Sequence, residues 1–445
     1  MTSALVYGLA VAGESTARAL RARGIDVVVA DDVVTPERRA VAEEIGAEFV
    51  GRPDDTTIEK LVRRSDLVCP SPGVPETHRV VDAALAADTD LVSEIELAYR
   101  WEQERDEPRP MLAVTGTDGK TTTTLLTVAM LEAAGLRTVD AGNTSTPLVD
   151  AITQDLDAFV VECTSFRLAW TPSFRAEAAA WLNLAPDHLN WHRSMHTYER
   201  AKGRIFLNQR VGDASIGFID DPVVMEHLRH SVARRRTFGL AGADYRVRDG
   251  ELAGPEGVIA PVESMRRRLP HDVTNALAAS ALVLESELAD VVAIQQALAE
   301  FVGPEHRLES LGKWNGVEWF NDSKATTPHA ARAAIAGFDR VVLIAGGYDK
   351  GVDLAPMAVD RDRVAALVAV GDTAESVATA FRGVPVIERT ELLDDAVRLA
   401  AGHARPGEVV LLSPGCASFD HYRGFEERGD HFRRLVLDHH RQGSR

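Results

Sequence analysis

The chain has 445 residues, is 45% hydrophobic and 26% charged, and carries a formal net charge of −18. This acidic balance argues against a nucleic-acid partner or an anionic membrane partner, because both require a basic face. The length exceeds that of a single core and predicts about two to four domains of a soluble globular enzyme.

Three cysteines, Cys69, Cys163 and Cys416, lie far apart in the chain. Their odd number and wide spacing predict reduced thiols rather than a disulfide framework or a zinc site. The first residues read as a strand and lack the basic and small-residue pattern of a signal peptide. The sequence has no apolar run of about 18 residues, so we expect a cytoplasmic protein without a membrane partner.

Lysine is rare, with 6 lysines against 43 arginines. In such a chain, we expect a lysine to be kept where a guanidinium, which does not lose its proton, cannot substitute. Four of the six lysines fall inside sequence motifs: Lys120, Lys202, Lys324 and Lys350.

Residues 1–105 begin with ALVYGLAVAGESTARALRARGIDVVVADD, which reads as strand, glycine turn, helix and strand. Gly8 and Gly13 match the outer glycines of the G-x-G-x-x-G fingerprint, whereas Ala10 stands at its middle position. Such a βαβ unit seats a nucleotide diphosphate at the helix N-terminus. Candidate contacts are two strand-end acids and the loop after a later strand: Asp31, Asp32, Ser71, Pro72 and Gly73.

The segment RWEQERDEPRP, residues 100–110, is charged and contains proline, which predicts a linker. Residues 106–304 then alternate strand and helix patterns, and residues 305–445 contain apolar runs that each end in glycine. The predicted fold is α/β with three domains. They are a Rossmann-like N-terminal domain over 1–105, a central P-loop ATPase-type parallel-sheet domain over 106–304, and a Rossmann-like C-terminal domain over 305–445.

The segment MLAVTGTDGKTTTTLL, residues 111–126, reads as a buried strand, a short loop and a helix. Residues 116–121 have the order G-x-x-G-K-T, which is shorter than the usual G-x-x-x-x-G-K-[ST] phosphate loop. Backbone N–H groups at the helix start would bind phosphate, with Lys120 at the β- and γ-phosphates and the Thr121 hydroxyl on Mg²⁺. A threonine-rich helix cap with a solvated lysine is the alternative.

Glu162 ends an apolar strand and is a candidate magnesium ligand or lysine partner, because a carboxylate there is costly without a cation. His188, His192 and His196 follow at four-residue spacing. On a helix this spacing could form a zinc face, but there is neither a nearby cysteine nor an H-E-x-x-H order. We expect His188 to be a polar site residue and the other two histidines to be structural.

These motifs, in this order, resemble those of the Mur ligase family, the ATP-dependent ligases of peptidoglycan synthesis. The resemblance covers essentially the whole chain. The short loop at 116–121, which lacks the early glycine, looks like the ATP loop of that family. The matching segments are GTDGKTT, GNTSTP, VVECTSFRL, LNLAPDHLNWH, YERAKGRIF, HDVTNALAA, EHRLE, NDSKATTP, AGGYDKG and LLSPGCASFDHYRGFEERGDHF.

The resemblance implies the following site residues. The implied ATP contacts are Gly116, Thr117, Asp118, Gly119, Lys120, Thr121, Thr122, Asn275, Arg307 and Asp322. The implied substrate contacts are Asn143, Ser71, Pro72, Gly73, Asp31, Lys324, Thr326, Lys350, Ser418 and Phe425. The implied catalytic residues are Lys120, Lys202, His188 and Glu162, and the implied metal ligands are Thr121, Glu162, His188 and a carbamylated Lys202.

The reaction that the resemblance implies is ATP-dependent amide-bond formation in peptidoglycan precursor synthesis. It would add D-glutamate to UDP-N-acetylmuramoyl-L-alanine through an acyl phosphate, with ATP and two Mg²⁺ ions. The partners would be these small molecules, and the protein would be a monomer. The three domains would bind the UDP substrate, ATP and the amino acid, in chain order.

Three alternatives remain at this stage. A related ligase could use L-glutamate or another amino acid. Residues 1–105 alone would also suit a dinucleotide-dependent oxidoreductase, although the missing middle glycine and the separate phosphate loop argue against it. A non-enzymatic nucleotide-binding regulator leaves Glu162, Lys202 and Lys350 unexplained.

Four positions depart from the pattern of the family. Asp118 and Asp272 stand where asparagine is usual, Arg167 where glutamine is usual, and Ser145 where glycine is usual. Asp118 adds a negative charge near the phosphates, and Asp272 is not expected to contact adenine. None of the four changes removes a catalytic group.

Overall fold

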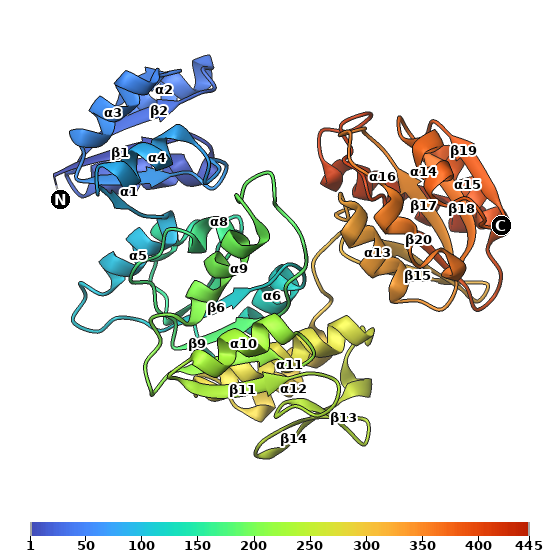
Figure 1. Ribbon diagram of the computed structural model, residues 1–445. Helices are drawn as coiled ribbons and strands as arrows, with labels where there is room; N and C mark the ends of the chain where they lie inside the picture. The colour runs from blue at the N-terminus through green and yellow to red at the C-terminus, as the bar shows by residue number, and fades with distance from the viewer. Residues whose placement is uncertain (1, 444–445) are drawn as a thin grey trace. The chain divides into compact units, whose positions relative to one another are not determined.

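The computed structural model of the protein describes residues 2–443, and the chain divides into two compact units, Met1–Val302 and Gly303–Arg445. The first unit contains two large parallel sheets and the second contains one large, mostly parallel sheet, each with helices on its faces (Figure 1). The predicted α/β class is therefore confirmed. The three domain ranges remain a prediction.

The N-terminal sheet is parallel, with the strand order β3-β2-β1-β4-β5. The order reverses beside β1, and in such sheets ligands bind in the crevice at this reversal. Its strands are β1 (Ser3–Tyr7), β2 (Asp26–Asp31), β3 (Glu48–Gly51), β4 (Leu67–Pro70) and β5 (Asp90–Leu91). Its helices are α1 (Val11–Ala22), α2 (Pro36–Glu44), α3 (Asp55–Arg63), α4 (Arg79–Ala86) and α5 (Glu94–Glu102).

The central sheet is also parallel, with the order β11-β10-β9-β6-β8-β7. Its strands are β6 (Met111–Thr115), β7 (Thr138–Gly142), β8 (Ala158–Glu162), β9 (Ala178–Trp181), β10 (Ala214–Phe218) and β11 (Arg234–Phe238). The associated helices are α6 (Lys120–Ala133), α7 (Leu148–Ala151), α8 (Ser165–Leu168), α9 (Met195–Gly203), η1 (Arg204–Phe206), α10 (Pro222–His230), η2 (Val262–Ser264), α11 (Pro270–Glu285) and α12 (Val291–Glu300).

A small antiparallel sheet that the sequence patterns did not predict follows the central sheet. Its strands, in the order β12-β13-β14, are β12 (Arg246–Arg248), β13 (Glu251–Gly254) and β14 (Gly257–Pro261).

The second unit contains a six-stranded sheet with the order β15-β16-β20-β17-β18-β19, in which only β15 is antiparallel to its neighbour. The strands are β15 (Glu309–Trp314), β16 (Val317–Asn321), β17 (Val341–Gly346), β18 (Val364–Val370), β19 (Ile387–Thr390) and β20 (Val409–Leu412). The helices are α13 (Pro328–Ala336), η3 (Ala355–Ala358), η4 (Arg361–Arg363), α14 (Ala374–Ala380), α15 (Leu393–His403) and α16 (Phe425–Gly443).

The central strands of all three sheets are short apolar runs that are buried on both faces, as parallel strands covered by helices require. Because β6 and β8 are adjacent and parallel, their carboxyl ends lie at the same edge of the sheet. The loops that follow these two strands carry the predicted phosphate loop and the predicted metal carboxylate.

The expected linker at 100–110 is partly wrong, because its first residues end helix α5. Trp101 is buried in the core of the first unit, and the guanidinium of Arg23 lies 4.2 Å from the centre of its ring. The buried Glu102 carboxylate accepts hydrogen bonds from Arg109 Nε at 2.8 Å and Nη2 at 2.6 Å. A buried aromatic residue and a buried ion pair therefore anchor a segment whose charged composition suggested solvent exposure.

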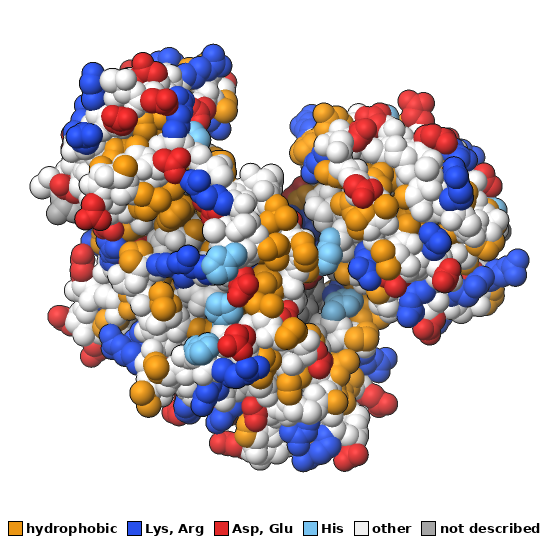
Figure 2. Space-filling model, in the orientation of Figure 1, with side chains coloured by type: hydrophobic (Ala, Val, Ile, Leu, Met, Phe, Trp, Pro, Cys, Tyr) orange, Lys and Arg blue, Asp and Glu red, His pale blue; other side chains and the backbone are white. Residues whose placement is uncertain are grey.

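Basic and acidic side chains are interspersed over the face of the molecule shown in Figure 2. Within residues 2–443, none of the helices has the length and apolar character needed to cross a bilayer.

Candidate functional site

The predicted phosphate loop joins the buried strand β6 to helix α6, as the sequence pattern indicated. Gly119 stands at the helix N-cap in a left-handed conformation, with φ +83°. A Cβ atom at this position would lie 2.6 Å from the side-chain oxygen of Asn275 on α11. Only glycine therefore fits here, and Asn275, a predicted ATP contact, lies directly beside the loop.

The first half of the loop is fixed by Asn183, a residue that follows strand β9. Its Oδ1 atom accepts hydrogen bonds from the backbone N–H groups of Thr117 and Asp118, each at 2.9 Å. The first N–H groups of α6 lack acceptors within their own helix, which is the usual basis of phosphate binding at a helix start. Lys120 Nζ folds back onto the carbonyls of Gly116 and Thr117, each at 2.9 Å, so its charge lies at this helix end.

Three predicted site residues meet at the carboxyl end of β8. Glu162 is 1% exposed and accepts hydrogen bonds from Thr121 Oγ1 at 2.7 Å and Asn143 Nδ2 at 2.8 Å. Mg²⁺ prefers carboxylate and hydroxyl oxygens and usually keeps several waters and substrate phosphates. Glu162 and Thr121 therefore fit a partial magnesium site.

Lys202, on α9, is buried beneath the phosphate loop. Its side chain is 1% exposed, its Nζ donates to the carbonyl of Gly116 at 2.6 Å, and it lies 4.9 Å from the ring centre of Tyr198. Burial, and then the nearby charge of Lys120, lowers the pKa of the Lys202 amine well below its ordinary value. An aromatic ring and a carbonyl therefore surround an amine that is readily neutral.

The three histidines do not form a zinc face. His188 has a left-handed backbone with φ +55° and packs against Phe166, with ring centres 4.6 Å apart. Burial, together with the charges of Lys120 and Lys202, lowers the pKa of His188 against the opposing effect of Asp187. Across the described part of the chain, no group of three or more His, Cys, Asp or Glu side chains is arranged to hold a metal ion.

His192 is buried and bonded at both ring nitrogens, in agreement with the structural role expected for it. Nδ1 lies 3.1 Å from Glu76 Oε2, and Nε2 lies 2.9 Å from Ser165 Oγ. The neighbouring Trp191 donates its indole N–H to the carbonyl of Pro72 at 2.8 Å. These contacts fasten the loop that contains Ser71, Pro72 and Gly73 to the central sheet.

The glycine turn after β1 is held closed by an acidic side chain. Asp31 is buried, and its carboxylate accepts from Leu9 N at 2.6 Å, Val33 N at 2.8 Å and Arg38 Nη1 at 2.6 Å. The Ser71 hydroxyl donates to the carbonyl of Gly8 in the same turn. Asp31 remains a predicted substrate contact, although its carboxylate is already engaged in these three bonds.

Asp32, in contrast to Asp31, keeps much of its side chain exposed. It accepts from Tyr7 Oη at 2.8 Å and lies 2.9 Å from His78 Nε2. Of the two acids at the end of β2, Asp32 is the more accessible to a ligand.

Arg167 and Asp272, two departures from the family pattern, have clear local partners. Arg167 is buried and donates from Nη1 to Asn143 Oδ1 at 2.7 Å. Its Nε lies 3.5 Å from Glu94 Oε2, and burial raises the pKa of the Glu94 carboxyl against the opposing charge of Arg167. Asp272 accepts from Arg267 Nε at 3.1 Å at the start of α11.

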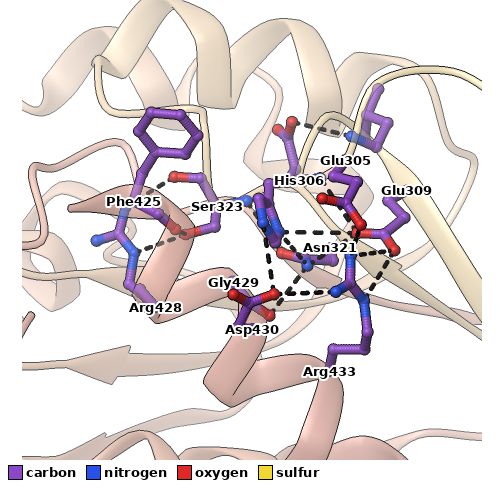
Figure 3. Close-up of polar contacts among 12 residues, drawn as sticks. Glu305, His306, Glu309, Asn321, Ser323, Phe425, Arg428, Gly429, Asp430 and Arg433 are labelled. Carbon is purple, nitrogen blue, oxygen red and sulfur yellow. Dashed lines mark hydrogen bonds and ion pairs between the residues drawn. The ribbon is translucent and has the colours of Figure 1, made fainter.

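The second unit holds the remaining predicted residues. The carboxylate of Asp322 accepts from Leu308 N at 3.1 Å and Ser413 Oγ at 2.7 Å. These bonds fix the loop in which Arg307 lies between two left-handed residues, His306 with φ +59° and Leu308 with φ +44°. His306 Nδ1 is 3.0 Å from Asn321 Nδ2 (Figure 3).

Lys324 and Phe425 are in direct contact, because Lys324 Nζ lies 3.7 Å from the centre of the Phe425 ring. Ser418 is buried, Thr326 is half-buried and Lys350 is exposed. The structure gives no direct contact of Ser418 with Lys350.

Arg428 is a buried residue that the sequence reasoning missed. Its Nη2 donates to the carbonyls of Ser323 at 2.8 Å and Cys416 at 3.2 Å, and Nη1 donates to that of Ala417 at 3.0 Å. Figure 3 shows it beside Ser323 and Phe425. It joins the segments that carry Lys324 and Ser418. Asn183 and Tyr198, whose Oη lies 3.0 Å from Thr117 Oγ1, were missed as well.

Comparison with known proteins gives matches along most of the chain. Residues 114–283 match the Mur ligase middle domain, and residues 306–416 match the Mur ligase glutamate ligase domain. A UDP-N-acetylmuramoylalanine–D-glutamate ligase of Frankia casuarinae is 40% identical over 97% of this chain and 93% of its own length. The enzyme of that name from Myxococcus xanthus is 37% identical, over 97% of each chain.

The chain belongs to the Mur ligase family. Solved structures agree with this Mur ligase in fold. A pseudomurein peptide ligase type C from Methanothermus fervidus has a TM-score of 0.59 and 15% identity, over 98% of this chain and 100% of its own. UDP-N-acetylmuramate-alanine ligase from Thermotoga maritima has a TM-score of 0.57 and 19% identity, over the whole of both chains.

Proposed function

We propose that this Mur ligase uses ATP to add D-glutamate to UDP-N-acetylmuramoyl-L-alanine, through an acyl phosphate, in peptidoglycan precursor synthesis. The observation that carries the proposal is the full-length similarity to relatives named for this activity. The meeting of Thr121 with Glu162 at the sheet edge that carries the phosphate loop supports it. A related ligase for L-glutamate or another amino acid is the second candidate.

The charge at the phosphate loop suits the first chemical step. An oxygen of the substrate carboxylate attacks the γ-phosphorus of ATP, the bond to the β-phosphate oxygen breaks, and ADP leaves. Both reactants are anions, so the reaction needs fixed positive charge where they meet. Lys120 and the N-terminus of α6 supply that charge in our proposal, with the other residues of 116–122, Asn275, Arg307 and Asp322 as further ATP contacts.

In the second step the glutamate amine attacks the activated carbonyl carbon, the nitrogen loses a proton and inorganic phosphate leaves. Glutamate brings two carboxylates that need partners. Lys350 and the hydroxyls of Thr326 and Ser418 are proposed for them. The stacked pair of Lys324 and Phe425 would supply a further cation and an apolar face for the side-chain methylenes.

Mg²⁺ neutralises negative charge on the phosphates when it is bound. Thr121 and Glu162 would hold one ion, and Glu162, His188 and a carbamylated Lys202 would hold a second. Carbamylation consumes a neutral amine and CO₂, and the burial of Lys202 favours that neutral form. We expect Lys202→Ala to abolish phosphate release and a short carboxylic acid to restore part of it, whereas a wild-type rate would rule out the carbamate.

The organisation proposed for the chain keeps the three ranges 1–105, 106–304 and 305–445 for the UDP substrate, ATP and the amino acid. Asn143, Asp31 and the loop that contains Ser71, Pro72 and Gly73 are the proposed contacts of the UDP substrate. We further propose a monomer that acts in the cytoplasm on small molecules, without a nucleic-acid or membrane partner.

Phosphate release by the purified protein tests the proposal directly. The assay contains ATP, Mg²⁺, UDP-N-acetylmuramoyl-L-alanine and either D- or L-glutamate. We expect phosphate release that requires D-glutamate. Absence of release with both enantiomers would reject the ligase activity, and release with L-glutamate alone would support the second candidate.

A further inference from the structure

Arg433, on helix α16, is a cation to which the proposed reaction gives no role. Its Nε donates to Glu309 Oε1 at 3.0 Å, and its Nη2 donates to the same oxygen at 2.7 Å and to Glu305 Oε1 at 3.2 Å. Its Nη1 donates to Asp430 Oδ1 at 2.9 Å, one turn earlier on the helix. A single guanidinium therefore joins α16 to two acids at the start of the second unit (Figure 3).

The two acids lie on either side of a strained segment, residues 306–308. His306 and Leu308 both have left-handed backbones, with φ +59° and φ +44°. This conformation is unfavourable for a bulky residue such as leucine, and it persists only where the surrounding structure imposes it. Arg307, a proposed ATP contact, lies between these two residues. The direction of its side chain therefore depends on the contacts that hold its neighbours.

The contacts that hold His306 lead back to an acid that Arg433 binds. The backbone N–H of His306 donates to Glu309 Oε2 at 3.1 Å, and Asn321 Nδ2 donates to the same oxygen at 3.1 Å. The His306 ring is buried, and a Cβ atom on Gly429 of α16 would collide with its Nδ1. One oxygen of Glu309 thus holds the left-handed residue, while the other is held by Arg433.

An ordinary surface ion pair is the alternative explanation for Arg433. Such pairs contribute little to stability, and their side chains are largely exposed. The Arg433 and Glu309 side chains, however, are only 26% and 18% exposed, and two N–H groups of the guanidinium share one carboxylate oxygen. The same guanidinium also binds the acid on the other side of residues 306–308. This arrangement constrains that segment rather than the helix alone.

We propose that Arg433 is a positioning residue for the proposed ATP contact Arg307. By holding Glu305 and Glu309, it keeps residues 306–308 in their strained conformation. This inference rests on the proposed function, because it takes Arg307 as an ATP contact. Without the guanidinium, the carboxylates around it repel one another and the segment relaxes to less strained backbone conformations. ATP must then order Arg307 when it binds, which weakens binding although no group that touches the nucleotide has been lost.

The test is a double-mutant cycle on nucleotide binding, measured by isothermal titration calorimetry with a non-hydrolysable ATP analogue and Mg²⁺. We expect Arg433→Gln to raise the dissociation constant about fivefold and Arg307→Gln to raise it about tenfold or more. In the Arg307→Gln background, Arg433→Gln should cause no further rise, because the residue through which it acts is gone. A general loss of stability would raise the constant by the same factor in both backgrounds.

Three further variants keep the result interpretable. Arg433→Lys should restore part of the affinity, because an ammonium group can still pair with Glu309, and it takes the place of Arg433→Gln in the cycle if the latter does not fold. Glu305→Gln removes one contact at a side chain that is 75% exposed, so it does not threaten folding, and it should raise the dissociation constant about twofold. Arg434→Gln, at the exposed neighbouring arginine of α16, should bind with wild-type affinity.

The outcomes separate this inference from the proposed function. An unchanged dissociation constant in a folded Arg433 variant, or an equal rise in both backgrounds, would show that Arg433 does not position Arg307. The proposed function stands in that case if the wild-type protein releases phosphate with D-glutamate. If the cycle shows the expected coupling but neither glutamate enantiomer supports phosphate release, the positioning role holds and the proposed function is wrong. If the wild-type protein does not bind the analogue, both are wrong.

Discussion

Two turns of the first unit have the same local backbone design but are bonded by side chains of opposite charge. Both join a buried parallel strand to a helix through a glycine turn: β1 to α1, and β6 to α6. In the first turn the buried Asp31 carboxylate accepts the N–H of Leu9. In the second turn Lys120 places its ammonium group over the loop carbonyls. The glycine pattern therefore sets the backbone, while neighbouring side chains decide whether the turn suits an anion.

Between the two turns, the largest effect is expected at the cation of the second turn. Lys120→Met should reduce phosphate release by about a thousandfold or more, because the attack of one anion on another loses its fixed positive charge. Steady-state phosphate release at saturating ATP measures the loss. Lys120→Arg should not restore the rate, since the planar guanidinium does not replace a compact ammonium group.

Lys313 offers a matched control for this substitution. It is an exposed lysine on β15, paired with Glu318 at 3.1 Å. Lys313→Met should keep the wild-type rate. A Lys120→Met enzyme with more than a tenth of the wild-type activity would contradict the assignment of the second turn to phosphate.

Glu162→Gln should lower phosphate release by about a hundredfold. The substitution keeps the size of the side chain but removes the charge that would hold Mg²⁺. Activity measured over a range of Mg²⁺ concentrations should show a raised requirement for the ion. An unchanged Mg²⁺ dependence would exclude Glu162 as a metal ligand.

Asp31, the acidic residue at the end of β2 that bonds the first turn, should affect stability rather than ATP use. Asp31→Ala removes the acceptor of two backbone N–H groups and the partner of Arg38. We expect unfolding to require about 2–4 kcal/mol less free energy, as measured by chemical denaturation. The KM for ATP should stay within about twofold of the wild-type value. A large change in the KM for ATP with unchanged stability would show that Asp31 serves ATP binding rather than the stability of the first turn.

The smallest expected effect is a pH dependence of stability at His192. Burial lowers its pKa, with Glu76 opposing the shift and Lys202 adding to it. Because the unfolded chain then binds the proton more readily, stability is complete above the ordinary histidine pKa of about 6.5 and falls as the pH drops towards the lowered native value. The loss should be on the order of 1 kcal/mol.

Denaturation curves of the wild type and His192→Gln between pH 7 and pH 5 check this effect; the variant should lose less stability over that interval. Equal losses in the two proteins would show that His192 does not titrate on unfolding.

The sequence was sufficient where a site is built from one strand, its turn and the next helix. The strand before the phosphate loop, the helix after it and the strand-end position of Glu162 followed from local patterns. Local patterns did not predict the hydrogen bonds of Asn183 to the phosphate loop, the three bonds of Asp31 or the bonds of Arg428 to three backbone carbonyls. Asn183 and Arg428 join segments that are distant in sequence, and Asp31 bonds Leu9, which lies 22 residues earlier, so no spacing or periodicity reveals these contacts.

The burial of Trp101 shows the same limit within a single segment. The residues around it are charged, and the pattern predicted a linker. Its position became clear only from the core that its side chain enters. Composition describes what a segment exposes on average and does not identify the residues that anchor it.

The most direct test of the account is a crystal structure of the protein with a non-hydrolysable ATP analogue and Mg²⁺. The account predicts the β- and γ-phosphates on the backbone N–H groups at the start of α6, beside Lys120, with Mg²⁺ in contact with Thr121 and Glu162. A nucleotide bound with its phosphates at the turn after β1, or a metal ion away from Glu162, would contradict it.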